Sequence, residues 1–264
     1  QDSILQDFCH FINFKSSNNF KEIWQWSIDN PSDFWSMFWD YSKIIGDKGH
    51  EIIKKDNVFN KTKFFPDSKL NYTENILKKK SDKLAINFLS EKGFEENISW
   101  NELYEKVCKF SSYLKKLNLQ KGDRVAAYVP NKIETIICFL ACAKNGIIWS
   151  SCSPDFGAQG VVDRFKQIEP KVFITCDYYY YNGKKINILD KVEEILKQIP
   201  SIKKVIAFNY NKQERESLKN FINFEETLKN DLDEVFERFE FNHPIYILFS
   251  SGTTGKPKCI THGS

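Results

Sequence analysis

The stretch RVAAYVPNKIETIICFLACAKNGIIWSSC, residues 124–152, predicts a strand, a helix and a second strand in that order. Its two ends, RVAAYV and IIWSSC, are short apolar runs of the kind that form strands buried on both faces. Between them, Asn131 and Glu134 indicate the start of a helix that runs to about Lys144, and Gly146 indicates its end. Two buried strands joined by a helix form a parallel βαβ unit, so the stretch predicts an α/β fold.

The same alternation of short apolar runs and helical stretches continues on both sides of this unit. Upstream, Ser99 and Glu102 form a capping box before a helix whose apolar residues repeat on one face. Downstream, helices are expected over 161–168 and 188–198, and strands over 171–175, 204–208 and 244–250. This pattern predicts a mostly parallel sheet flanked by helices.

The first part of the chain is rich in aromatic residues at helical spacing. Asn30 and Pro31 suit the start of a helix. The aromatic residues that follow at three- and four-residue spacing are Phe34, Trp35, Phe38 and Trp39. Such a stripe most often packs against the protein's own core and only rarely lines a ligand site. We therefore expect a helical, aromatic-rich N-terminal extension over residues 1–82 and an α/β domain over residues 83–264.

Composition argues against several classes of function. Lysine and arginine number 38 and aspartate and glutamate 35, and the resulting net charge of +3 gives no case for a nucleic-acid partner. The longest strongly apolar run, residues 136–143, is far shorter than the roughly 20 residues that cross a bilayer, so no membrane span is expected. The four tyrosines at 178–181 suggest compositional bias rather than a special segment.

The seven cysteines indicate neither a zinc site nor a disulfide framework, because no CxxC pair occurs and no histidine stands at ligand spacing. We expect reduced, mostly buried thiols and no metal site formed by this chain. The start, QDSILQDF, lacks the basic and apolar regions of a signal peptide. Reduced thiols without a signal peptide predict a cytoplasmic protein.

A second informative stretch is YILFSSGTTGKPK, residues 246–258, in which an apolar strand leads into a loop rich in glycine and hydroxyl groups. In an α/β sheet, ligands gather beyond the carboxyl ends of the strands, where this loop would lie. Glycines let main-chain N–H groups approach an anion, hydroxyls add donors and lysines add charge, so the loop is expected to bind polyphosphate. The candidate phosphate-binding residues are Ser250, Ser251, Gly252, Thr253, Thr254, Gly255, Lys256, Pro257 and Lys258.

This loop differs from the Walker loop, G-x-x-x-x-G-K-[ST], in its glycine spacing and in having Pro257 where that motif has a hydroxyl residue. Proline has no N–H and resists continuing a helix, so the loop is not the strand–loop–helix cradle of the NTPases. A plain flexible hairpin is the other interpretation, but a hairpin would not need glycines, hydroxyls and Lys-Pro-Lys together.

Residues 250–258, SSGTTGKPK, resemble the phosphate loop of the adenylate-forming enzymes, the superfamily of acyl-CoA synthetases, adenylation domains and luciferases. The resemblance implies that the α/β part is the first portion of their large N-terminal domain. It also implies a reaction in which ATP and Mg²⁺ couple a carboxylate to AMP, pyrophosphate leaves, and the acyl group passes to a thiol. The loop's implied role is to hold the β- and γ-phosphates while the α-phosphorus is attacked.

Longer blocks resemble the acetoacetyl-CoA synthetase group of this superfamily over nearly the whole chain. They include FWSMFWDYSKIIG, FFPDSKLNYTENIL, YYYNGKK and, most specifically, WSSCSPDFGAQGVVDRFKQIEPK. The implied activity is a ligase of lipid metabolism that forms acetoacetyl-CoA from acetoacetate, ATP and CoA. The last block is the most specific because the acetyl-CoA synthetase relatives carry a glycine-rich version of residues 153–157. The alternative is an acetyl- or propionyl-CoA synthetase. In those relatives this turn and basic residues after the next strand lie near CoA.

By the same resemblance, Lys184, which follows Gly183, is a candidate for binding a CoA phosphate, and a solvated loop lysine is the other interpretation. Cys259 stands where the superfamily most often has glycine, and we interpret it as a neutral packing residue rather than a nucleophile. His262, just past the loop, is interpreted as a local hydrogen-bonding residue.

In the superfamily, the residues that bind ribose, metal and adenine, and the lysine of the C-terminal domain, all follow the phosphate loop. The resemblance therefore implies that residues 1–264 are an N-terminal portion of a ligase, contain no catalytic residue and are inactive by themselves. The alternative is a complete nucleotide- or pyrophosphate-binding module without ligase activity.

Overall fold

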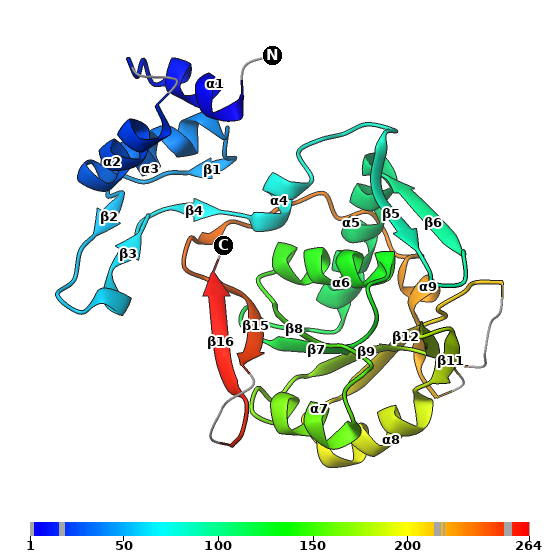
Figure 1. Ribbon diagram of the computed structural model, residues 1–264. Helices are drawn as coiled ribbons and strands as arrows, with labels where there is room; N and C mark the ends of the chain where they lie inside the picture. Colours follow the sequence, from blue (N-terminus) through cyan, green and yellow to red (C-terminus); the bar gives the residue numbers. More distant parts are fainter. Residues whose placement is uncertain (1–2, 16–18, 214–217, 219, 251–254, 264) are drawn as a thin grey trace. The chain divides into compact units, whose positions relative to one another are not determined.

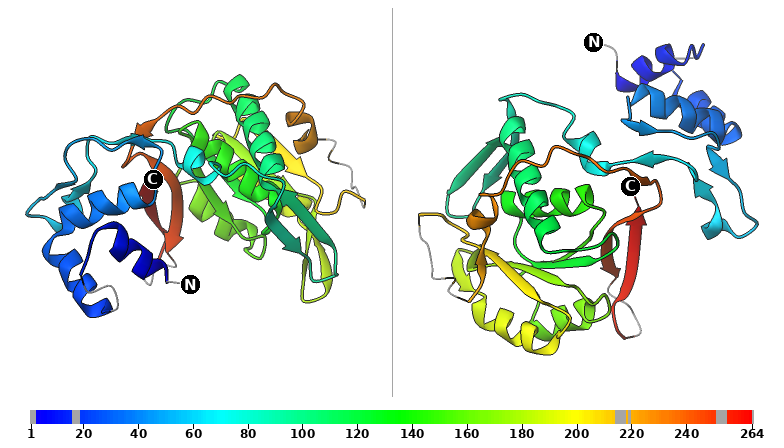
Figure 2. Two further views of the ribbon diagram at one scale, coloured as in Figure 1. Left: turned by 90° about the horizontal axis from the view of Figure 1, so that it is seen from above. Right: turned by 180° about the vertical axis from the view of Figure 1, so that it is seen from behind.

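The chain divides into two units in the computed structural model, whose ribbon is shown in Figures 1 and 2. The structure describes residues 3–15, 19–213, 218, 220–250 and 255–263. One unit comprises residues 1–71 and 238–242, and the other comprises residues 72–237 and 243–264. The boundary expected after residue 82 stays a prediction.

The larger unit is built on a seven-stranded sheet in the order β13–β12–β9–β7–β8–β15–β16. Its strands are β7 (Arg124–Tyr128), β8 (Ile148–Cys152), β9 (Val172–Cys176), β12 (Lys204–Phe208), β13 (Ile222–Asn223), β15 (Pro244–Ser250) and β16 (Lys258–Gly263). Neighbours from β13 to β15 pair in parallel, and β16 pairs antiparallel with β15. The predicted mostly parallel sheet is confirmed.

Helices cover both faces of this sheet (Figures 1 and 2). One face carries α5 (Trp100–Lys116) and α6 (Ile133–Lys144), and the other carries α7 (Ala158–Phe165) and α8 (Leu189–Gln198). The α/β architecture predicted from the sequence is therefore confirmed, with strands and helices alternating along the chain as expected.

The central strand–helix–strand prediction is confirmed, but the start of its helix differs from the expectation. The residue at the N-cap of α6 is Lys132 rather than Asn131, and no side chain caps the helix there. Gly146 has φ +66°, the left-handed conformation that glycine adopts readily after a helix end. The stop signal was therefore predicted correctly, whereas the start lies one residue later than expected and has no side-chain cap.

The predicted capping box at the start of α5 is present. The Ser99 hydroxyl accepts a hydrogen bond from the Glu102 amide at 3.2 Å, and the Glu102 carboxylate accepts one from the Ser99 amide at 2.8 Å. Helix α7 begins at Ala158, three residues before its predicted start, because Gly157 occupies the N-cap position. These local signals therefore located both helices to within a few residues.

Two hairpins were not predicted from the sequence. They are β5 (Leu84–Leu89) with β6 (Glu95–Ser99), and β10 (Tyr178–Tyr181) with β11 (Lys184–Asn187). The interpretation of the four tyrosines as compositional bias was wrong, since they form β10 and the rings of Tyr178 and Tyr179 are buried. Two short helices, α4 (Tyr72–Ile76) and α9 (Phe224–Thr227), complete this unit within the described residues.

The smaller unit is helical at its start and otherwise has short strands. Its helices are α1 (Ile4–Phe11), α2 (Phe20–Asp29) and α3 (Pro31–Tyr41), with a 3₁₀ turn at Phe59–Lys61. Strands β1 (Gly46–Asp47) and β14 (Phe239–Glu240) flank β4 (Lys69–Leu70), and β2 (Ile53–Lys54) pairs with β3 (Lys63–Phe64). The predicted helical, aromatic-rich start of the chain is thus observed.

The aromatic stripe of α3 packs inside this smaller unit. The Phe8 ring of α1 lies 5.9 Å from the rings of both Phe34 and Phe38, in edge-on contacts. The Trp39 ring is buried and lies 5.0 Å from the ring of Phe65. Helix α3 does begin at Pro31, as expected, but the Asn30 side chain donates to the carbonyl of Trp26 and does not cap α3.

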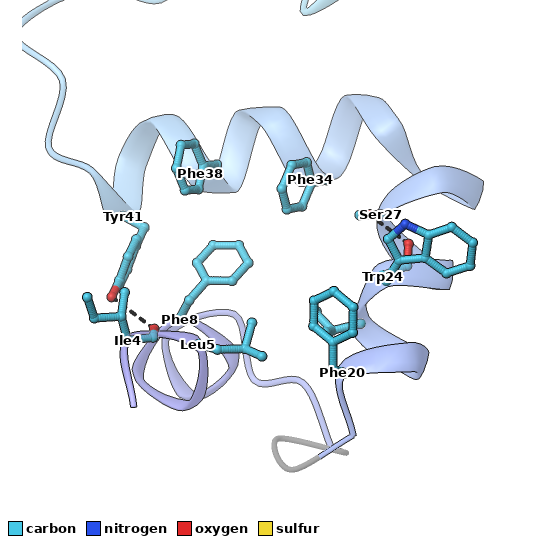
Figure 3. Close-up of a pocket in the computed structure, with 10 residues that line it drawn as sticks. Ile4, Leu5, Phe8, Phe20, Trp24, Ser27, Phe34, Phe38 and Tyr41 are labelled. Carbon is cyan, nitrogen blue, oxygen red and sulfur yellow. Dashed lines mark hydrogen bonds between the residues drawn. The ribbon is translucent and has the colours of Figure 1, made fainter. Parts of the chain in front are cut away.

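An apolar pocket of about 370 Å³ lies among α1, α2 and α3 (Figure 3). Its lining residues are Ile4, Leu5, Phe8, Phe20, Ile23, Trp24, Ser27, Phe34, Phe38 and Tyr41. The Ser27 hydroxyl donates to the Trp24 carbonyl at 2.7 Å, and the Tyr41 hydroxyl contacts Asp7 at 3.2 Å. No charged side chain lines the pocket, so its walls offer packing contacts rather than chemistry.

A buried lysine holds the irregular segment at residues 229–237 against the larger unit. Lys144, at the end of α6, is fully buried, and its ammonium donates to the Asp233 carboxylate at 2.9 Å and to the Val235 carbonyl at 2.7 Å. Lys115 of α5 pairs with the same carboxylate at 2.7 Å. Burial by itself would raise the pKa of Asp233, but the two lysines outweigh it and lower the pKa to about 2.

Asp233→Asn is expected to lower the free energy of unfolding at pH 7 by about 1–2 kcal/mol, because it removes the carboxylate that pairs with both lysines. The folded-state pKa of about 2 lies below the ordinary value of about 3.9. The stabilisation is therefore complete at neutral pH and is lost as pH falls from about 4 towards 2. Urea unfolding at pH 7 and at pH 2–3 measures both effects. Asp231→Asn, in the same segment and exposed, is the control, and a pH-independent difference would contradict the prediction.

Candidate phosphate-binding site

The candidate phosphate loop connects β15 to β16 at one edge of the sheet. Strand β15 ends at Ser250 and β16 begins at Lys258, and these two residues are paired across the ladder. The strand expected over residues 244–250 is confirmed. Of the nine candidate residues, Ser251, Gly252, Thr253 and Thr254 lie outside the described residues, while Ser250 and residues 255–258 lie within them.

The loop leaves the sheet at the carboxyl ends of its parallel strands. Strand β15 runs parallel to β8, with Tyr246 paired to Trp149. The buried Ser150 hydroxyl donates to the Ile247 carbonyl at 2.8 Å and so joins the two strands by a side-chain bond. Ligands of open α/β sheets bind beyond these carboxyl ends. The candidate phosphate loop begins there, at Ser250, the last residue of β15.

The exit of the loop combines a glycine conformation with two exposed lysines. Gly255 has φ +137°, a conformation that side chains disfavour, although a Cβ there would meet no atom within 4 Å. The requirement for glycine is thus set by the backbone and not by lack of space. Lys256 and Lys258 are both exposed, so their ammonium groups are available to an anionic ligand.

Helix α7 and the turn that follows it contact the two flanks of the loop. The Phe165 ring, at the end of α7, lies 6.4 Å from the ring of Phe249, which precedes Ser250. On the exit side, the Gln167 side-chain amide donates to the Pro257 carbonyl at 2.9 Å. Gln167 and Lys256 also line one polar pocket of about 370 Å³ with residues of α7 and α8.

A second pocket, of about 280 Å³, lies beyond the carboxyl ends of β7 and β8. Its walls include the turn at residues 153–155 and the tyrosines of β10. The Tyr128 hydroxyl, fully buried, lies 2.7 Å from the carbonyl oxygens of both Pro154 and Phe156. The Tyr179 hydroxyl donates to the Asp155 carboxylate at 2.9 Å, and burial together with this bond raises the pKa of Tyr179 to about 12. The turn is therefore fixed by two tyrosines.

Lys184 lies at the start of β11, next to the tight turn of the β10–β11 hairpin. Asn182 and Gly183 form this turn with φ +48° and +72°, values typical of a type I′ turn. The Glu91 carboxylate accepts hydrogen bonds from the main-chain N–H groups of Asn182 and Gly183 at 3.3 and 2.9 Å, and these bonds fix the turn. Lys184 itself is exposed, and its assignment to a CoA phosphate stays a prediction.

The two residues just past the loop have the local environments of strand residues. Cys259 is exposed, while the other six cysteines are buried and all seven are unpaired, as expected. The His262 ring stacks on the Tyr246 ring of the paired strand, with centroids 4.9 Å apart and planes at 26°. A hydrogen bond by this histidine was expected from the sequence, and the contact that the structure shows is ring stacking.

A buried charge cluster at the ends of the central strands was missed in the sequence. Lys132, four residues after β7, is fully buried and pairs with the Glu96 and Glu134 carboxylates. Its ammonium lies 4.6, 4.9 and 5.5 Å from the ring centroids of Phe88, Phe94 and Tyr210, respectively. The only signal in the sequence was a lysine shortly after a buried strand. Without the fold, such a lysine cannot be distinguished from a surface residue.

Comparison with known proteins fits this arrangement. The AMP-binding enzyme family matches residues 73–264. The chain belongs to the AMP-binding enzyme family. It is 38% identical over 264 residues to acetoacetyl-coenzyme A synthetase of Rhizobium meliloti (strain 1021), covering 98% of this chain and 40% of that protein. It is 39% identical over 261 residues to acetoacetyl-CoA synthetase of Xenopus tropicalis, covering 93% of this chain and 39% of that protein.

A solved member of this AMP-binding family has the same fold. Acetoacetyl-CoA synthetase from Streptomyces lividans matches with a TM-score of 0.90 at 30% identity, covering 98% of this chain and 41% of that one. The fold is therefore that of the N-terminal domain of an adenylate-forming enzyme. The chain spans about two fifths of the length of these relatives.

Neither a membrane span nor a protein metal site is found in the part of the chain that the structure describes. No helix there is both long and apolar enough to cross a bilayer. Within the same residues, no group of three or more His, Cys, Asp or Glu side chains is placed to hold a metal ion.

Tyr128→Phe is expected to loosen the turn at residues 153–157, because it removes the hydroxyl that lies between the Pro154 and Phe156 carbonyls. A lost buried hydrogen bond of this kind costs about 1–2 kcal/mol of stability. Amide hydrogen exchange of the turn should become faster, while exchange in α5 should change little. Tyr181→Phe, on the same surface but 57% exposed, is the control. Unchanged exchange in the turn would show that the hydroxyl does not hold it.

Proposed function

We propose that the protein carrying this chain is an ATP-dependent acid–thiol ligase that activates acetoacetate. Acetoacetate and ATP would form acetoacetyl-AMP and pyrophosphate, and the acyl group would then pass to CoA with release of AMP. The observation that carries the proposal is that β15, which leads into SSGTTGKPK, ends at Ser250 at the carboxyl end of a parallel sheet in an AMP-binding family fold. The relatives named acetoacetyl-CoA synthetase support acetoacetate as the acid.

In this proposal, residues Ser250–Lys258 hold the β- and γ-phosphates of ATP. The main-chain N–H groups near Gly252 and Gly255, the hydroxyls of the loop and the two lysines would supply charge-assisted hydrogen bonds worth about 1.5–3 kcal/mol each where water is excluded. Their role is positional and electrostatic, because the loop holds the leaving pyrophosphate while the carboxylate attacks the α-phosphorus.

CoA is proposed to approach the pocket beside the turn at residues 153–157. Support comes from the fixed geometry of this turn, which Tyr128 and Tyr179 hold, and from the exposed lysine that follows the turn of the neighbouring hairpin. Lys184 is proposed to meet a phosphate of CoA. The Asp155 carboxylate also lines the pocket and would repel phosphate, so a phosphate is expected nearer the hairpin than the turn.

Mg²⁺ is proposed to enter as the complex with ATP, since the described residues offer it no carboxylate cluster. When bound, it would neutralise phosphate charge. We also propose the cytoplasm as the location, supported by seven unpaired cysteines of which six are buried.

The substrate is tested by acid-dependent exchange of labelled pyrophosphate into ATP, using the protein expressed from its complete open reading frame. Acetoacetate is expected to give the highest kcat/KM, above acetate and propionate. Malonamate belongs in the panel, because one relative is named malonamoyl-CoA synthetase, from Penicillium aethiopicum, at 32% identity over 94% of this chain. Exchange with acetate but not acetoacetate would move the assignment to the acetyl-CoA synthetase alternative. No exchange with any acid would favour a non-catalytic nucleotide-binding protein.

Gly255→Val and Lys256→Ala are expected to slow adenylate formation at least tenfold and to slow transfer from preformed acyl-AMP to CoA much less. Valine cannot adopt φ +137° without strain, and Lys256→Ala removes a positive charge from the candidate phosphate loop. Pre-steady-state assays of the two half-reactions provide the measurement. Gly93→Val, in the β5–β6 turn at φ +75° and in open space, controls for backbone strain in general. Equal slowing of both half-reactions would contradict a phosphate-holding role.

A further inference from the structure

Gln167 connects the end of α7 to the exit of the candidate phosphate loop. Its side-chain nitrogen donates to the Asp163 carbonyl at 2.8 Å and to the Pro257 carbonyl at 2.9 Å. A primary amide nitrogen carries two hydrogens, so both are used by these two acceptors. One acceptor belongs to α7 and the other to the loop exit, 90 residues further along the chain. The Gln167 side chain therefore bridges α7 and the loop exit, and the two hydrogen bonds fix the distance between them.

Helix α7, to which one end of this bridge is bonded, is held in place by core packing. Val161, Val162 and Phe165 of α7 are buried, and the Phe165 ring contacts the rings of Phe173 in β9 and Phe249 in β15 at 6.1 and 6.4 Å. The strand that enters the loop thus contacts the last residue of α7, and the segment that leaves it contacts Gln167, two residues past the end of that helix. A substitution of Gln167 would release the loop exit at Pro257, while Phe249 on the entry side would keep its contact with Phe165.

We propose that Gln167 is a positioning residue that sets the location of Lys256 and Lys258 relative to bound polyphosphate. This rests on the proposed function of the loop. Pro257 stands between the two lysines and has no N–H, so its carbonyl is the main-chain group by which a hydrogen bond can hold it. Holding that carbonyl fixes the direction in which the chain carries both ammonium groups.

The bond acts on geometry more than on folding. Gln167 is exposed, so the free energy gained from its hydrogen bonds is largely offset by lost bonds to water. A misplacement of about 1 Å in a group that stabilises a transition state can nevertheless slow a reaction by up to about 100-fold. Loss of Gln167 should therefore lower the rate of adenylate formation without a matching loss of thermal stability.

Two substitutions of Gln167 test the inference in the protein expressed from its complete open reading frame. Gln167→Met keeps the length of the side chain and removes the two hydrogen bonds of the amide nitrogen, together with the 3.9 Å contact in which the Cys259 thiol donates to the amide oxygen. We expect about a tenfold fall in kcat for adenylate formation. Transfer from preformed acyl-AMP to CoA should change less than twofold. Gln167→Glu should be at least as slow as the methionine variant at pH 8, where a carboxylate cannot donate to a carbonyl and repels polyphosphate. It should regain part of its activity relative to wild type as pH falls from about 6 towards 4.5 and the carboxyl gains one proton to donate.

The matched control is Gln159→Met, the same change in α7, whose last residue lies two positions before Gln167. Gln159 lines the same polar pocket, but its side-chain nitrogen donates to the Asp163 carboxylate at 2.7 Å and is not bonded to the loop. Its half-reactions should be those of wild type, and the methionine variant at 167 should show a pH profile parallel to wild type.

The outcomes separate this inference from the function on which it rests. Wild-type adenylation rates in Gln167→Met, or equal slowing of both half-reactions with a lowered Tm, would overturn the positioning role. If wild-type protein shows no exchange with any acid, the proposed ligase function fails instead. Amide hydrogen exchange at residues 258–260 then decides the structural part: faster exchange in Gln167→Met than in Gln159→Met supports the bridge, and equal exchange overturns it.

Discussion

The parallel pairing of β7 with β8 on one side and β9 on the other is the constraint on which the larger unit depends. Val125, Ala126, Ala127 and Tyr128 are completely buried in this strand, so its register cannot shift without exposing core residues. Because every neighbour from β13 to β15 runs parallel to it, all their carboxyl ends meet at one edge of the sheet. The candidate phosphate loop and the turn at residues 153–157 are neighbours in the fold for this reason, although about 100 residues separate them.

After β7 the chain adds β8 on one side, and it then crosses to the other side to add β9, β12 and β13. The gap between β7 and β9 is therefore the topological switch point, where doubly wound sheets usually bind a ligand. Here the protein's own Lys132 lies beside that position, surrounded by Phe88, Phe94 and Tyr210. A buried ammonium is tolerated because the Glu96 and Glu134 carboxylates compensate the lost hydration. One pocket at this edge, lined by residues 129–131 after β7 and by tyrosines of β10, lies next to that position, and another lies at the exit from β15.

The parts of the fold that local patterns specify could be predicted from the sequence. Strand β7, the end of α6 at Gly146 and the capping box of α5 each depend on residues within a few positions of one another. The β10–β11 hairpin was missed despite a local signal, Asn182-Gly183, whereas the burial of its tyrosines depends on distant contacts such as that between Tyr178 and Tyr210. The loop motif was visible for the same local reason, whereas Gln167 gained its importance only when the fold brought it to Pro257.

One short helix connects the two regions to which the proposed chemistry is assigned. The N-cap of α7 is Gly157, the last residue of the turn that Tyr128 holds, and its last residue, Phe165, packs against the strand entering the phosphate loop. Eight helical residues span only about 12 Å. In the proposed reaction, adenylation joins the carboxylate oxygen to the α-phosphorus, and thioester formation then joins the carbon of the same carboxyl group to sulfur. The groups that bind the two partners must therefore keep a fixed separation over such a distance. A rigid, buried helix with one end at each region satisfies that requirement better than a loop would, because a loop's ends move independently.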